Sequence, residues 1–170
     1  MGLLTYGRQK EIDAMIDAVK SRTGLSYPKN SLLEIVNELG ISVSFVELPV
    51  TQDNIEIDGI IRWDHGNAKI LINDSYNPTR KTFTLAHELG HFFLHPEIDR
   101  LRIDKFNYRE DTQESQQETE ANYFAGSLLM PKDEFIKVIS VAEDVSVVAR
   151  YFGVSEIAVK NRLRWIVKNS

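Results

Sequence analysis

Two histidines and a glutamate near the middle of the chain have the types and spacing of a hydrolytic metal site. They stand in the segment His87-Glu88-Leu89-Gly90-His91. In an α-helix, positions i and i+4 lie on one face, so His87 and His91 can both bind a single ion. Glu88 can then lean toward a water molecule on that ion and act as its base. The pattern predicts one zinc ion and peptide-bond hydrolysis.

The residues around this motif predict the helix that must hold it. Asn77 followed by Pro78 is typical of a capped helix start with proline in the first turn. A buried stripe on this helix is predicted from Leu85, Leu89, Phe92 and Phe93. The structural alternative is a core helix with incidental histidines. The chain has only four histidines, which argues against a chance match.

A zinc ion held by two histidines needs a third protein ligand and keeps one position open. His95 lies in the same segment, but it is about 12 Å further along the helix at 1.5 Å per residue. Ligand atoms of one tetrahedral zinc lie only about 3–3.5 Å apart, which excludes His95. The third ligand is therefore expected to be a carboxylate from a following helix.

Two carboxylates in the stretch 118–131 can fill this role. On a helix, Glu118 shares a face with Asn122, Ala125 and Leu129, whereas Glu120 points roughly 200° away. The apolar members of the first face are expected to pack inward, so Glu118 is the predicted ligand and Glu120 the alternative. Asn122, one turn on, is placed to hydrogen-bond a ligating histidine.

Composition narrows the class of protein. The chain has 170 residues, 42% of them hydrophobic, which suffices for one domain with a core. It contains no cysteine, which excludes disulfides, thiolate zinc sites and a cysteine nucleophile. The net charge of −5 does not suggest a nucleic-acid-binding surface, and no apolar run reaches membrane-span length. We expect a single cytoplasmic domain over residues 1–170.

Periodicity of apolar residues gives the remaining elements. Helical spacing predicts helices near residues 8–21 and 28–39, which we interpret as scaffold. Alternating patterns predict strands at 41–45, 59–63 and 68–72, with a turn at 64–67 whose His65 is interpreted as solvated. The predicted fold class is α+β. A small, mainly antiparallel three-stranded sheet packs against a helical bundle that carries the HExxH helix and a following Glu-bearing helix.

Two further segments carry hypotheses about substrate and partners. Residues 96–114 form a strongly polar loop between the two predicted metal-binding helices, which we expect to be poorly ordered without substrate and to govern selectivity. Residues 140–170 form a helical pair that resembles a helix-turn-helix, and five basic residues against one acidic lie between positions 150 and 170. This pair can pack on the core, dock a partner protein or contact DNA.

Together, the motifs resemble those of the ImmA/IrrE-type zinc metallopeptidases. The resemblance rests on His87-Glu88-Leu89-Gly90-His91 with Phe92 to His95, on Glu118-x-Glu120-Ala121-Asn122, and on Leu128 to Pro131, and spans about residues 30–165. It implies an intracellular protease whose substrate is a helix-turn-helix repressor or another regulatory protein. The alternative is a non-enzymatic DNA- or protein-binding regulator with a vestigial zinc site.

The expected mechanism gives separate roles to the zinc ion and to Glu88. Zinc polarises the scissile carbonyl and acidifies water, and Glu88 carries a proton from that water to the leaving amine. Four residues remain open as stabilisers of the oxyanion, namely Tyr76, Arg80, Tyr108 and Tyr123. The expected partner is a protein substrate, with neither membrane nor direct nucleic-acid contact.

Overall fold

The computed structural model describes residues 4–64, 67–96, 101–105 and 116–168. The helices in these ranges are α1 (Tyr6–Thr23), α2 (Leu32–Glu38), α3 (Pro78–Leu94), α4 (Gln116–Leu129), α5 (Lys132–Val141), α6 (Val145–Phe152) and α7 (Glu156–Lys168). The strands are β1 (Ser42–Val46), β2 (Ile57–Asp64), β3 (Asn67–Asn73) and β4 (Leu101–Lys105). No helix in the described ranges has the length and apolar character needed to span a bilayer.

Local capping explains where the N-terminal helices begin and end. Helix α1 stops at Gly24, whose backbone adopts the left-handed conformation with φ of 68°. Helix α2 begins at Leu32, later than the predicted start at residue 28. The reason is the capping box: the backbone amide of Glu34 donates to the Ser31 hydroxyl, and the Ser31 amide donates to the Glu34 carboxylate.

The sheet has one strand more than predicted and includes one parallel pair. It has four strands in the order β1-β3-β2-β4, and β1 pairs with β3 in parallel, whereas the other two pairings are antiparallel. The predicted number of three strands is therefore wrong, whereas two of the three pairings are antiparallel, so the sheet is mainly antiparallel as predicted. The parallel pair arises because the chain reverses twice between β1 and β3, so both strands run the same way. Alternation of apolar residues identifies a strand but not its neighbour.

The fourth strand lies inside the segment that was predicted to be a polar loop. Strand β4 occupies the middle of residues 96–114 and pairs with β2 at one edge of the sheet. The loop residues 97–100 and 106–114 lie outside the described residues, as does His65 in the turn after β2. Leu101 and Ile103 do alternate with polar residues in this strand, but the pattern covers only five residues within a strongly polar stretch.

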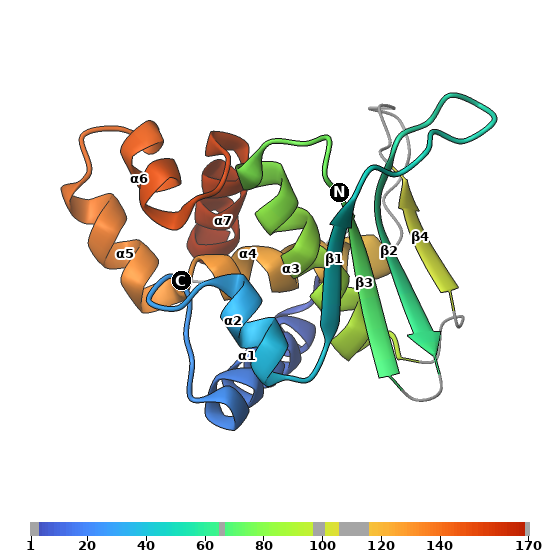
Figure 1. The fold of residues 1–170 in the computed structure, drawn as a ribbon. Coiled ribbons are helices and arrows are strands. Elements are labelled where there is room, and N and C mark those ends of the chain that lie inside the picture. Colours follow the sequence, from blue (N-terminus) through green and yellow to red (C-terminus); the bar gives the residue numbers. More distant parts are fainter. Residues whose placement is uncertain (1–3, 65–66, 97–100, 106–115, 169–170) are drawn as a thin grey trace.

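Helix α3 lies between the sheet and the other helices (Figure 1). One face of the sheet is buried against it, with Ile61, Ile70 and Ile72 fully buried in the main hydrophobic cluster. Lys69, on the opposite face of β3, is exposed. On its other side α3 packs closely on α4, which also contacts α1 and α7. The two helices that carry the predicted metal ligands are thus the centre of the molecule.

The C-terminal helices pack on this centre through an apolar face. Helix α6 ends at Gly153, whose φ of 63° lets the chain turn into α7. Val148, Phe152 and Val159 are buried in the same hydrophobic cluster as the α3–α4 pair. Arg162 is also buried, and its guanidinium donates to the Met130 carbonyl and the Ser127 hydroxyl. One of the five basic residues of this region therefore serves the core.

Candidate metal centre

Helix α3 places the two motif histidines side by side. Asn77 caps the helix by accepting from the Arg80 amide, and Pro78 occupies its first turn, as the sequence predicts. One turn of helix separates His87 from His91, and their Nε2 atoms are 3.0 Å apart. Both rings are buried between α3 and the neighbouring elements. Two imidazole lone pairs directed at one point are a typical start of a metal site.

Glu118 of α4 supplies the third donor. One carboxylate oxygen lies 3.2 Å from His87 Nε2, and the other lies 3.4 Å from His91 Nε2. The two imidazole nitrogens are 3.0 Å apart, and one ligand atom from each of the three residues can be chosen so that all lie within 4.8 Å of one another. Ligands bonded to a tetrahedral zinc at about 2.0–2.1 Å are separated by about 3.3 Å, so the donor set and spacing fit this ion.

The charge state of Glu118 also suits a metal ligand. Burial alone would raise the pKa of this carboxyl, but interactions with His87 and His91 outweigh it and hold the pKa well below the usual range. Glu118 is therefore ionised at neutral pH, as a carboxylate ligand must be. The side chain remains partly exposed at 31%, which leaves one side of the centre open to solvent.

Asn122 fixes the orientation of one histidine. Its side-chain oxygen lies 2.9 Å from His87 Nδ1, so the hydrogen bond predicted for Asn122 is present. An amide oxygen can only accept, so Nδ1 of His87 must carry the proton. The lone pair of His87 then resides on Nε2, the atom that faces His91 and Glu118.

A glycine at the α3–α4 contact makes this arrangement possible. A Cβ atom on Gly90 would lie 3.0 Å from Ala121 Cα and 3.1 Å from the Ala121 carbonyl oxygen. Only a residue without a side chain lets the backbone of α4 approach α3 so closely. No role was predicted for Gly90 from the sequence. Its signal was a glycine in the interior of a helix, where a packing reason usually offsets the cost in propensity.

A second glycine places the candidate base. Glu88 is fully buried, and a Cβ atom on Gly59 of β2 would lie 2.6 Å from Glu88 Oε1. The sheet therefore forms one wall of the position that the Glu88 carboxylate occupies. A glycine within a strand pattern often marks close approach by another group, and this signal could have identified Gly59.

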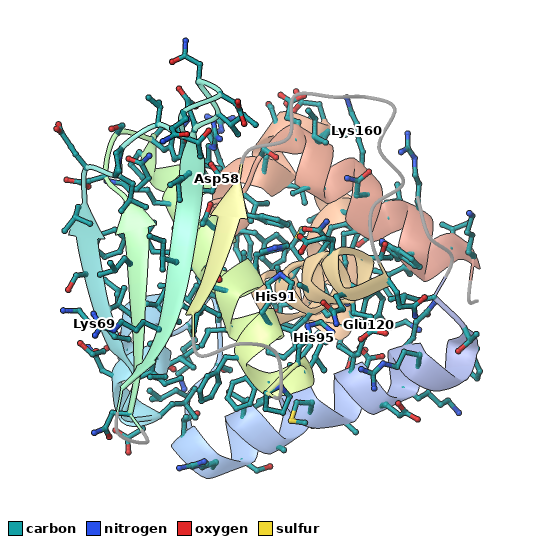
Figure 2. All side chains as sticks on the ribbon, turned by 90° about the vertical axis from the view of Figure 1, so that its right-hand side faces the viewer. Asp58, Lys69, His91, His95, Glu120 and Lys160 are labelled. Atoms are coloured by element: carbon teal, nitrogen blue, oxygen red, sulfur yellow. The ribbon has the colours of Figure 1, made fainter. Side chains whose placement is uncertain are left out.

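The alternative third ligand, Glu120, points elsewhere. It is 5% exposed, and its carboxylate contacts His95 Nε2 at 3.0 Å and Arg8 at 2.6 Å rather than the His87–His91 pair. Burial would raise the pKa of Glu120, but hydrogen bonds from Arg8, Gln116 and His95 lower it to about 2. Figure 2 shows His91, His95 and Glu120 pointing toward one another between α3 and α4, with α1 alongside.

The candidates for oxyanion stabilisation are held in other contacts. Arg80 forms an ion pair with Asp58 at 2.7 Å and lies over the Tyr76 ring. The Tyr76 hydroxyl donates to Glu56, and burial together with this bond raises the Tyr76 pKa. Tyr123 is buried and donates to Asp13 of α1. Tyr108 lies outside the described residues, so the assignment stays open.

Known proteins resemble this chain in sequence. It is 37% identical over 98 residues to the uncharacterized immunity region protein 2 of Bacillus phage phi105, which covers 52% of this chain and 55% of that protein. It is 39% identical over 71 residues to the radiation response metalloprotease IrrE of Deinococcus deserti, 42% of this chain and 25% of that protein. The metallopeptidase ImmA of Bacillus subtilis is 24% identical over 113 residues, 65% of each chain. The chain thus spans less than two thirds of these relatives' lengths.

A solved structure and a family model complete the comparison. A Mycobacterium tuberculosis transcriptional regulator matches 94% of this chain and 47% of its own, with a TM-score of 0.57 and 20% identity, which shows the fold alone. Residues 37–164 match the peptidase M78 family, described as the IrrE N-terminal-like domain. That range includes α3, α4 and the His87–His91–Glu118 group. The chain therefore belongs to the IrrE N-terminal-like, or ImmA/IrrE, family.

Proposed function

We propose that this protein is a zinc-dependent endopeptidase with a single ion bound by His87, His91 and Glu118. The observation that carries the proposal is the convergence of two imidazole nitrogens 3.0 Å apart and a carboxylate whose two oxygens lie 3.2 and 3.4 Å from them, on two helices that pack closely. Two imidazoles and a carboxylate, with the fourth position open, form the donor set of hydrolytic rather than structural zinc sites. Relatives named as metalloproteases support the same function.

Each protein group has a defined task in this proposal. Zinc, when bound, supplies Lewis-acid chemistry that acidifies water and polarises a peptide carbonyl. Glu88 takes the proton of the attacking water on its carboxylate and delivers it to the leaving amine. Its burial excludes bulk water from that carboxylate, and the wall formed at Gly59 limits where it can move.

We further propose that the substrate is a protein, and specifically a helix-turn-helix repressor. The support is the names of two relatives, one from the immunity region of a phage and one called ImmA. An extended segment of a substrate can be bound by strand addition at a sheet edge. Glu88 contacts β2 at Gly59. Strand β4 is the edge strand next to β2, so of the two sheet edges it is the one closer to Glu88 in the strand order.

The test is cleavage of candidate repressors by the purified, zinc-loaded protein, followed by mass spectrometry of the products. Glu88→Gln should fold and retain zinc, but cleavage should fall by about a hundredfold or more, the scale for losing a general base. Glu38→Gln on the exposed surface of α2 is the matched control and should cleave as the wild type does. Undiminished cleavage by Glu88→Gln would rule out the assigned base.

The rival function, a DNA- or protein-binding regulator with a vestigial zinc site, predicts a different result. Such a protein would bind DNA with a strong salt dependence and cleave no repressor. The basic residues Arg150, Lys160 and Arg164 are exposed on α6 and α7, whereas Arg162 is committed to the core. A salt titration of DNA binding, run beside the cleavage assay, separates the two functions.

A further inference from the structure

The outer nitrogen of His91 faces another histidine, whereas that of His87 faces an amide oxygen. His91 Nδ1 lies 3.0 Å from the Nδ1 atom of His95, which follows the last residue of α3 and is 8% exposed. Two ring nitrogens at this distance share one proton, because one must donate and the other accept. Which one donates depends on what else each ring binds.

The direction of this bond follows if the proposed metal site is right, and the inference rests on it. His91 would give the lone pair of Nε2 to the metal, so its proton must reside on Nδ1 and be donated to His95 Nδ1. His95 then carries its own proton on Nε2. That atom lies 3.0 Å from a carboxylate oxygen of Glu120, which can only accept. One arrangement of protons therefore satisfies both the His91–His95 contact and the His95–Glu120 contact.

Helix α1 anchors the far end of this series of hydrogen bonds, at Glu120. Arg8 donates to Glu120 at 2.6 Å, and Gln116 donates to its other oxygen at 3.0 Å. Arg8 is itself steadied by Glu11 at 2.8 Å. Arg8 lies outside residues 37–164, the part of the chain that matches the family.

We propose that His95, Glu120 and Arg8 form a positioning chain that fixes the tautomer of His91 and strengthens Nε2 as a metal ligand. A histidine whose outer nitrogen donates toward a carboxylate is a better ligand than one hydrogen-bonded to a neutral group. His87 instead has the neutral amide oxygen of Asn122 at its outer nitrogen. Helix α1, which the sequence analysis interprets as scaffold, is thereby a component of the metal centre.

A merely structural role is the competing explanation, because an Arg8–Glu120 ion pair also joins α1 to α4. The two explanations differ in what they predict for zinc affinity. A structural bridge changes the stability of the metal-free protein, whereas a positioning chain changes the dissociation constant for zinc in variants that remain equally folded. Substitution of His95 separates them, because His95 contacts the metal ligand and the anchor at once.

The experiment measures zinc affinity of the full chain by competition with a chromophoric chelator, with the melting temperature of the metal-free protein recorded for each variant. His95→Phe should weaken zinc binding about 10- to 100-fold, the range for losing such a partner. His95→Gln should bind nearly as the wild type does, because its amide oxygen can accept from His91 and its amide N–H can donate to Glu120. Glu120→Gln should lose about tenfold, and Arg8→Ala a few-fold.

Glu38→Gln, on the exposed surface of α2 and outside this network, is the matched control, and it should leave zinc affinity unchanged. Wild-type zinc affinity in His95→Phe and Glu120→Gln would overturn the positioning chain. A uniform loss of stability without a change in zinc affinity would do the same. The zinc-affinity assay needs no substrate. The positioning chain of His95, Glu120 and Arg8 can therefore be confirmed even if no repressor is cleaved, so its failure and that of the proposed peptidase activity are distinguishable.

Discussion

The α3–α4 pair and the α6–α7 pair are both amphipathic, but the first pair buries polar side chains and the second exposes them to solvent. Between α3 and α4, His87, His91 and Glu120 are buried and contact other polar groups. On α6 and α7, the basic side chains Arg150, Lys160 and Arg164 face solvent. Burial of a polar group is costly unless it is satisfied, so the first pair indicates chemistry and the second a solvated surface.

Arg162 is an exception to this division between buried and solvent-exposed polar side chains. It belongs to the basic C-terminal segment, but its side chain points into the core and donates to α4 and the residue after it. Counting charges along a helix therefore overstates the cationic surface. A surface of α6 and α7 cannot be assigned to DNA from composition alone, because one of the charges counted is internal.

The largest expected effect concerns the metal ligands between α3 and α4. Glu118→Ala should abolish stoichiometric zinc binding, because it removes one of three protein ligands. Glu120→Ala should retain zinc with weakened affinity, since its carboxylate faces His95 and Arg8 instead. Metal analysis after dialysis checks both. The reverse result would move the ligand to Glu120, and full zinc retention in both His87→Ala and His91→Ala would remove the site.

The next largest expected effect concerns Arg162, the buried basic residue of α7. Arg162→Ala should destabilise the protein by about 3 kcal/mol, because it leaves the Met130 carbonyl without its donor and opens a cavity. Arg164→Ala is the matched control, since Arg164 is exposed and bonds only at 3.3 Å to Asn161 among the contacts described. Its effect should be within about 0.5 kcal/mol. Denaturant unfolding measures both, and equal effects would contradict the distinction between the two arginines.

Two helix glycines sharpen the comparison between close and open packing. Gly90→Ala should cost about 2 kcal/mol and weaken zinc binding, because α4 must move away and carry Glu118 with it. Gly126→Ala on α4 meets nothing within 4 Å and should stabilise the protein by about 0.5–1 kcal/mol through helix propensity. Unfolding curves with and without zinc report both. A stabilising Gly90→Ala would show that the contact at Ala121 is not tight.

The smallest expected effect concerns the sheet side of the centre. Gly59→Ala places a methyl group where the Glu88 carboxylate lies, so the base should shift while the ligands stay. Cleavage should fall by about tenfold, and zinc content should be unchanged. A steady-state assay with a repressor substrate and metal analysis of the same sample provide the check. Loss of zinc together with activity would mean that Gly59 supports the whole centre rather than Glu88 alone.

The sequence predicted what short-range periodicity encodes. Helical spacing placed His87 and His91 together, and the shared face of Glu118 and Asn122 led to the group that the structure brings together. The cap at Asn77 followed from local hydrogen bonding. Each of these inferences needs only neighbouring residues.

What the sequence could not supply depends on residues distant in the chain. The parallel pairing of β1 with β3 and the edge position of β4 are choices among partners, which alternation does not make. Arg8 looks like a surface residue of an amphipathic helix until Glu120 is placed beside it. Gly59 and Gly90 acquire meaning only when Glu88 and Ala121 come into contact with them.

The contacts between α1 and α4 have a consequence for the order of folding. Arg8 bonds to Glu120 across 112 residues, and Tyr123 bonds to Asp13 across 110. Contacts so distant form late, since closing a long loop costs entropy before any contact repays it. During synthesis the N-terminal helix must wait until α4 has left the ribosome. We therefore expect α1 to dock last, onto a sheet and helix pair that are already assembled.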